Sequence, residues 1–159
     1  MASTDQTAVL MICMGNICRS PLAEGIFRYL VNERRVADRF LIDSCGTGGW
    51  HAGELADHRM RETARGHGIG LDSRARQVRR EDFTTFDHLI CMDEDNRANI
   101  LAMGAPTDRV SLLLDFDRSH DVVEVPDPYY GGDDGFEHVY QLVYPACEAL
   151  LDALLGQSS

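Results

Sequence analysis

A segment near the start of the chain places a cysteine and an arginine at a spacing suited to phosphate chemistry. Cys13 and Arg19 are separated by the five uncharged residues Met14-Gly15-Asn16-Ile17-Cys18, and Ser20-Pro21 follows them. Gly15 permits a positive φ, and a serine before a proline is typical of a helix start. The loop amides, the helix dipole and the Arg19 guanidinium would then face one anion. We expect a dianionic phosphoryl group there, bound by Met14, Gly15, Asn16, Ile17, Cys18, Arg19 and Ser20.

Cys13 is the predicted nucleophile of this segment. A free cysteine, with a pKa of about 8.5, is mostly protonated at neutral pH, but helix N-termini and arginines favour the reactive thiolate. Cys91 and Arg97 repeat the spacing, but the acidic residues 93–95 between them would repel phosphate. We therefore interpret that second match as a coincidence. The alternative for Cys13, a buried thiol without chemistry, is disfavoured because strand, glycine loop, arginine and helix start occur in order.

A phosphoryl transfer to sulfur also needs an acid for the leaving oxygen, and Asp127 is the predicted one. Pro126 and Pro128 enclose it and would stiffen its loop, although a Pro-Asp-Pro segment is often only a turn. Tyr129-Tyr130 follows directly and favours a slot for an aromatic phosphoester. Trp50, after a glycine-rich stretch, would form the opposite wall, although a lone tryptophan is more often a core residue.

Two further polar residues, Asn16 and His67, are candidates to brace the phosphate loop by hydrogen bonding. His67 precedes Gly68, so it is equally typical of a residue that interacts with the dipole at a helix C-terminus, and both interpretations stay open. The histidines show no His-x-x-x-His pair, and Cys13 and Cys18 lack the second pair that a zinc site requires. We therefore predict no metal and no cofactor.

The elements that must position these residues alternate between apolar and amphipathic segments. The predicted strands cover 8–13, 40–45, 88–92 and 110–114, and the predicted helices cover 21–32, 57–67, 93–103 and 135–155. This pattern predicts an α/β fold: a single doubly wound domain with a four-stranded parallel sheet, helices on both faces, and the phosphate loop after the first strand. We expect a flexible N-terminus over 1–7, the domain over 8–155 and a tail over 156–159.

Length and composition limit the classes of function. The chain has 159 residues, which suits one domain, and all 15 basic residues are arginines. Without lysine, a Schiff-base enzyme and a Walker A nucleotide site are excluded. The net charge of −11 disfavours nucleic acid and anionic membranes as partners, and no apolar run approaches the roughly 20 residues of a membrane span. The five cysteines are an odd number, which indicates reduced thiols, and residues 1–7 have no signal-peptide character. We therefore expect a cytoplasmic protein.

Taken together, these segments resemble the low-molecular-weight protein tyrosine phosphatase family from Val9 to about Leu155. Residues 13–21 resemble its phosphate-loop signature, Asp43-Ser44-Cys45-Gly46-Thr47 its second-strand block, and Asp127-Pro128-Tyr129-Tyr130 its acid loop. The resemblance implies hydrolysis of phosphotyrosine through a phosphocysteine. The roles it implies are nucleophile for Cys13, phosphate binding for Arg19, general acid for Asp127, a thiolate contact for Ser20, and loop support for Asn16, Ser44 and His67.

The expected partner is a tyrosine-phosphorylated protein, and we expect the enzyme to be a monomer. Cys18 is the predicted redox partner of Cys13, because a reactive thiolate is oxidised first and Cys18 lies on the same loop. Cys45, where the family commonly has alanine, is the next candidate for that role.

Three other functions fit these residues less well than phosphotyrosine hydrolysis. Arsenate reduction on the same fold needs further resolving cysteines, and residues 82–93 supply only Cys91. Phosphoarginine hydrolysis resembles relatives with a threonine in the phosphate loop, where this chain has Ile17. A catalytically silent phosphate-binding module is disfavoured because the predicted nucleophile, arginine and acid occur together.

Overall fold

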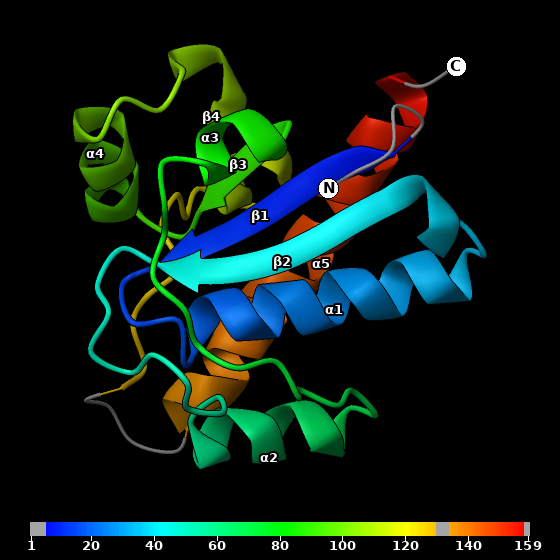
Figure 1. Ribbon diagram of the computed structural model, residues 1–159. Coiled ribbons are helices and arrows are strands. Elements are labelled where there is room, and N and C mark those ends of the chain that lie inside the picture. The colour runs from blue at the N-terminus through cyan, green and yellow to red at the C-terminus, as the bar shows by residue number, and fades with distance from the viewer. Residues whose placement is uncertain (1–5, 130–133, 158–159) are drawn as a thin grey trace.

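The computed structural model describes residues 6–129 and 134–157 and is built on a parallel β-sheet (Figure 1). Its strands are β1 (Thr7–Cys13), β2 (Phe40–Gly46), β3 (His88–Cys91) and β4 (Val110–Leu112). The spatial order is β2-β1-β3-β4, with parallel pairing throughout. Because β1 has a neighbour on each side and helices on each face, residues 8–12 have no exposed surface. This burial explains why that strand is a continuous apolar run.

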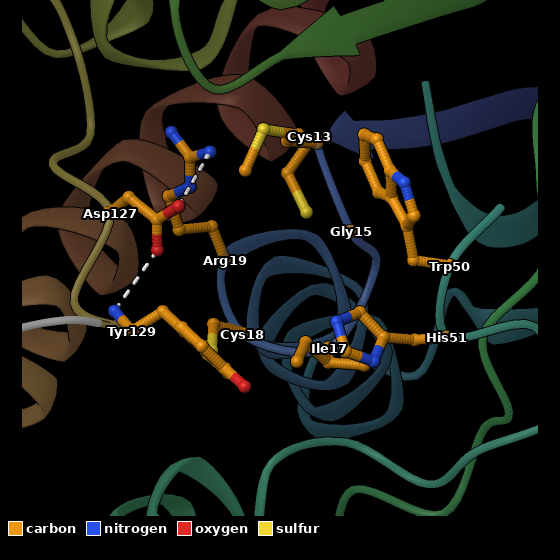
Figure 2. A pocket seen from close by; sticks show the side chains of 10 residues that line it. Cys13, Gly15, Ile17, Cys18, Arg19, Trp50, His51, Asp127 and Tyr129 are labelled. Carbon is orange, nitrogen blue, oxygen red and sulfur yellow. Dashed lines mark hydrogen bonds and ion pairs between the residues drawn. The ribbon is translucent and has the colours of Figure 1, made fainter. Parts of the chain in front are cut away.

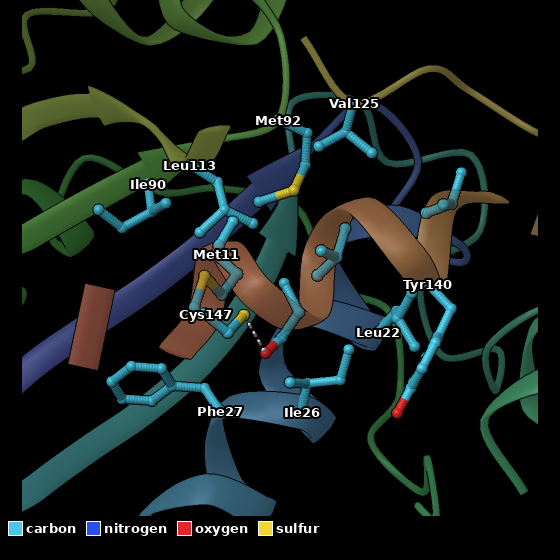
Figure 3. Packing of buried hydrophobic residues seen from close by; sticks show 14 of the residues in the cluster. Met11, Leu22, Ile26, Phe27, Ile90, Met92, Leu113, Val125, Tyr140 and Cys147 are labelled. Carbon is cyan, nitrogen blue, oxygen red and sulfur yellow. Dashed lines mark hydrogen bonds between the residues drawn. The ribbon is translucent and has the colours of Figure 1, made fainter. Parts of the chain in front are cut away.

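Helices cover both faces of the sheet. They are α1 (Arg19–Glu33), α2 (His58–Gly66), α3 (Asp82–Thr85), α4 (Glu94–Ala102) and α5 (Asp134–Gln157), with 3-10 turns η1 (Ala37–Arg39), η2 (Thr107–Arg109) and η3 (Leu113–Phe116). On one face, Met11 and Ile90 of the sheet pack with Phe27 of α1 and Cys147 of α5 (Figure 3). The other face packs against α3 and α4. The predicted doubly wound α/β fold is confirmed.

Several element boundaries differ from the predicted ones. The first strand begins at Thr7, inside the segment expected to be flexible, because Thr7 pairs with Phe40. The last helix continues past Pro145 to Gln157, into the expected tail. The fourth strand ends at Leu112, because the next residues form η3. Within the described ranges, no helix is both long and apolar enough to cross a lipid bilayer.

Candidate active site

The loop after β1 turns sharply over the N-terminus of α1. The residue with positive φ is Asn16, at 58°, and not Gly15 as predicted. Asparagine tolerates this left-handed conformation better than most residues because its side chain bonds locally. A Cβ at Gly15 would lie 3.2 Å from Cδ2 of His51, a tight contact that a small shift of the His51 ring would have to relieve.

The first turn of α1 forms the floor of the loop. The helix begins at Arg19, its N-cap residue is Cys18, and no side chain caps it. The prediction that Ser20 is the N-cap is therefore wrong. First-turn amides without a side-chain acceptor are suited to bind an anion. Ser20 lies within that turn, and its Oγ is 3.0 Å from Sγ of Cys13.

Hydrogen bonds converge on the sulfur of Cys13, which is 2 % exposed. The main-chain N–H of Asn16 donates to Sγ over 3.2 Å. The Asn16 side-chain amide donates to Oγ of Ser20 over 2.7 Å and to Oγ of Ser44 over 3.0 Å. The Asn16 amide occupies a lone pair of the Ser20 oxygen, and the Ser20 hydroxyl proton has two acceptors within reach, Sγ of Cys13 at 3.0 Å and the carbonyl of Cys45 at 3.3 Å. These donors are placed to hydrogen-bond a sulfur atom that carries negative charge.

Two residues that the sequence analysis missed fix the orientation of this network. Ser44 donates to the carboxylate of Glu24 over 2.6 Å, and Glu24 is 4 % exposed. The main-chain N–H of Arg76 donates to Oδ1 of Asn16 over 3.0 Å. Both ends of the Asn16 amide therefore have fixed partners, which leaves its N–H groups directed at the two serines. Glu24 is on the inner side of α1. Its contact with Ser44 of β2 could not be predicted, because no short-range sequence pattern links the two residues.

Arg19 is 3 % exposed and is held from two sides. Its Nη1 lies 2.6 Å from Oδ2 of Asp93 and donates to the carbonyl of Val125 over 3.0 Å. Its Nη2 lies 3.7 Å from Oδ2 of Asp127. Burial opposes the charge of Arg19, but the neighbouring Cys13 and Asp93 outweigh it and raise the pKa above its ordinary value. Asp93, which the sequence analysis treated only as a repelling charge, is therefore a partner of the phosphate-binding arginine.

The three predicted catalytic side chains meet in one cavity of about 350 Å³. Figure 2 shows Cys13, Arg19 and Asp127 around it, with Tyr129 below and Trp50 at the opposite wall. Asp127 Oδ1 accepts from the main-chain N–H of Tyr129 over 3.0 Å. Trp50 is 70 % exposed, so it belongs to the rim of the cavity and not to the core. The cavity is lined by Cys13, Met14, Gly15, Ile17, Cys18, Arg19, Trp50, His51, Asp127 and Tyr129.

Comparison with known families agrees with this geometry. The model of the family described as low molecular weight phosphotyrosine protein phosphatase matches residues 8–159. The chain belongs to this family. The pig low molecular weight phosphotyrosine protein phosphatase is 40% identical over 156 residues, which cover 96% of this chain and 98% of the relative.

Solved structures of several other proteins superpose closely on this chain. A protein tyrosine phosphatase from Entamoeba histolytica has a TM-score of 0.92 at 36% identity, covering 97% of this chain and 100% of that one. YfkJ from Bacillus subtilis also has a TM-score of 0.92, at 39% identity, covering 97% and 98%. A Drosophila arginine phosphatase has a TM-score of 0.86 at 30% identity, covering 92% and 96%.

His51 is a cavity residue of this phosphatase that the sequence analysis missed. Its Nδ1 lies 3.2 Å from Oε2 of Glu54, and its ring centroid is 6.2 Å from that of Tyr129. The only sequence signal was its position next to Trp50. Of the predicted cleft residues, Tyr130 lies outside the described part of the chain.

His67 does not support the phosphate loop. It follows α2, and its Nε2 lies 2.9 Å from both carboxylate oxygens of Glu137 on α5. Its ring stacks on Tyr140 at 3.7 Å between centroids. His67 therefore joins α2 to α5, because the end of α2 faces that helix and not the cavity.

The remaining thiols occupy different environments in this phosphatase. Cys18 lines the cavity with Cys13, and burial, followed by the charge of Asp57, raises its pKa well above the usual value. Cys45 lies on the opposite face of the sheet, among Leu10 and Phe83, because successive strand residues alternate faces. Its side chain is thus directed away from the loop that its sequence position suggested.

Proposed function

We propose that this enzyme of the protein-tyrosine-phosphatase class hydrolyses phosphotyrosine in proteins through a phosphocysteine on Cys13. One observation carries the proposal: the Cys13 sulfur, the Arg19 guanidinium and the Asp127 carboxylate line a single cavity above the uncapped start of α1. This reaction requires a nucleophile, a cationic group that binds two phosphoryl oxygens, and a proton donor.

The first step transfers the phosphoryl group to sulfur. The loop amides and Arg19 bind the phosphoryl oxygens, and the Cys13 thiolate attacks phosphorus. As the S–P bond forms, the P–O bond to the tyrosyl oxygen breaks, and Asp127 gives its proton to that oxygen. The contact of 2.6 Å between Arg19 and Asp93 supports the arginine in a fixed orientation for this step.

The second step releases phosphate and restores the enzyme. Asp127, now a carboxylate, takes a proton from water, and the water oxygen attacks phosphorus as the S–P bond breaks. Sulfur leaves as a thiolate, which the Asn16 N–H and the Ser20 hydroxyl stabilise.

The lining of the cavity favours an aromatic phosphoester. Trp50 and Tyr129 offer ring surfaces, and Ile17 contributes an apolar side chain. The similarity to an arginine phosphatase makes phosphoarginine the second candidate. Ile17 disfavours phosphoarginine as the substrate, because we expect related enzymes that hydrolyse phosphoarginine to have threonine at this position of the phosphate loop. Arsenate reduction is disfavoured since Cys91 is fully buried in β3.

Replacement of Cys13 by serine tests the proposal. We expect Cys13→Ser to lose hydrolysis of an aryl phosphate and of a phosphotyrosine peptide, and to lose the phosphorylated adduct that mass spectrometry detects after acid quench. Cys147→Ala, which removes a core thiol, is the matched control and should retain activity. Substantial turnover by Cys13→Ser would contradict the mechanism, and faster hydrolysis of a phosphoarginine peptide would contradict the substrate.

We further propose that the enzyme acts as a monomer and that it is cytoplasmic. We also propose that a Cys13–Cys18 disulfide inactivates it reversibly, and the cavity that these two thiols share supports this disulfide. The five unpaired thiols support a reducing compartment. Cys18→Ala should remain active but should not recover with reductant after peroxide, whereas unchanged recovery would exclude Cys18 as the resolving thiol.

A further inference from the structure

A second cavity, of about 420 Å³, lies beside β4 at the edge of the sheet. It is formed where α4, η3 and α5 approach that strand. Figure 1 labels β4, α4 and α5. It shares no lining residue with the catalytic cavity. It is lined by Arg97, Val110, Ser111, Leu112, Asp115, Phe116, Arg118, Ala149 and Ala153.

Two guanidinium groups from different elements contribute to this cavity in a chain with a net charge of −11. Arg97, on α4, has one charged contact among the described residues, 3.5 Å from Glu94, and its Nε is buried without a hydrogen-bond partner. Arg118, just after η3, is exposed and has no ion pair or hydrogen bond within the described ranges. The Nε of Arg97 and the guanidinium of Arg118 therefore remain as hydrogen-bond donors at this cavity. Asp115 is the single carboxylate among the lining residues.

The remaining wall of the cavity is apolar and leaves open space. Val110 and Leu112 of β4 are buried, and Phe116 adds an aromatic ring. Ala149 and Ala153 are four residues apart on one side of α5, and their small side chains leave room. A concave volume of this size with an apolar wall and a few charged groups is typical of a small-molecule site.

We propose that this second cavity binds a small amphipathic monoanion, a carboxylate attached to a planar apolar body. Arginine pairs with a carboxylate through two parallel hydrogen bonds, which gives Arg118 and Arg97 a defined ligand. The apolar wall would cover the body of the ligand. Asp115 would accept a hydrogen bond from a hydroxyl group of the ligand and would repel a second negative charge. The catalytic reaction uses none of these residues.

Amide NMR titration with 4-hydroxybenzoate tests the proposal on the whole chain. Saturating inorganic phosphate fills the catalytic loop, so that the probe competes poorly for it. We expect saturable shifts at residues 110–112 and 115–118 and around Ala149. The neutral 4-hydroxybenzamide should produce much weaker shifts. Shifts confined to the phosphate loop, or equal binding of the amide, would overturn the proposal.

Two variants separate the charge of the cavity from its volume. Arg118→Gln should weaken binding by about tenfold or more, because it removes a charged hydrogen bond. Ala149→Leu should weaken binding by filling the space while leaving both arginines. Arg80→Gln, an exposed arginine elsewhere, is the matched control. All three should hydrolyse an aryl phosphate as the unmodified protein does, which also reports folding. Unchanged binding in both test variants would overturn the proposal, whatever the outcome for Cys13.

Discussion

At the scale of single residues, the side-chain amide of Asn16 organises the candidate nucleophile. Asn16 has positive φ, donates to both Ser20 and Ser44, and is fixed by the main chain of Arg76. The sequence could predict the loop, because the spacing of Cys13 and Arg19 and the proline that follows are local signals. It could not predict the partner from residue 76, because that contact joins segments 60 residues apart.

Loss of the Asn16 side chain should weaken catalysis without loss of the fold. Asn16→Ala removes the donors that orient Ser20, so the thiolate of Cys13 is stabilised less. We expect kcat/KM for an aryl phosphate to fall by about 10- to 100-fold. Asn99→Ala, at an exposed position on α4, is the control. An unchanged kcat/KM in a folded Asn16→Ala variant would show that the Asn16 side chain does not act on Cys13.

Asp127 should matter most when the leaving group is poor. Asp127→Asn cannot donate a proton, so we expect the alkaline limb of the pH profile to disappear and alkyl-like phosphates to slow by about 10²- to 10⁴-fold. Activated aryl phosphates, which leave without protonation, should slow far less. A leaving-group series measured by steady-state kinetics checks this. Equal slowing across the series would mean that Asp127 shapes the loop without donating the proton.

At the scale of elements, the N-terminus of α4 holds both the arginine and the acid loop. Asp93 caps the helix and pairs with Arg19, while Glu124 accepts from the first main-chain N–H of α4, that of Glu94, over 2.8 Å. The main-chain N–H of Val125 donates to the carbonyl of Met92 over 2.8 Å. The alternating pattern predicted this helix, but not its role, because its partners lie about 30 and 70 residues away.

Glu124 should therefore help to position Asp127 by holding the acid loop against α4, without contacting Asp127 itself. Glu124→Ala removes the carboxylate that ties the acid loop to the helix dipole, and we expect kcat for poor leaving groups to fall by about three- to tenfold with little change for good ones. Glu124→Gln retains an acceptor oxygen and should restore part of the loss. Asp121→Ala, an exposed acidic residue of the same loop, is the control. Equal effects on all leaving groups would indicate a general loss of stability instead.

At the scale of the whole molecule, one buried sheet determines both the fold and the state of the thiols. Apolar runs predicted the four strands because their burial on both faces leaves a strong sequence signal. Which face each cysteine occupies follows from register, and register depends on pairing that the sequence does not state. Cys45 and Cys91 belong to one core and Cys147 to the other.

Burial of these thiols should make the protein less stable in alkali. Burial raises the pKa of Cys91 to about 12 and raises that of Cys18, Cys45 and Cys147 above the usual range. The contribution of these thiols to the free energy of unfolding does not change below their pKa of about 8.5 in the unfolded chain, because the thiols are then protonated in both the folded and the unfolded chain. Above it the unfolded chain releases protons that the folded chain retains, so each thiol lowers the free energy of unfolding by about 1.4 kcal/mol per pH unit.

Denaturant unfolding under reductant, from pH 7 to 10, measures this slope. Cys147→Ala should be less stable at pH 7, because it leaves a core cavity, but its free energy of unfolding should decline less steeply above about pH 8.5. Ala146→Gly, a truncation at the adjacent buried position, is the matched control and should keep the full alkaline slope. Parallel profiles for both variants would show that the Cys147 thiol ionises equally in the folded and unfolded chains, and that burial in this core does not hold its proton.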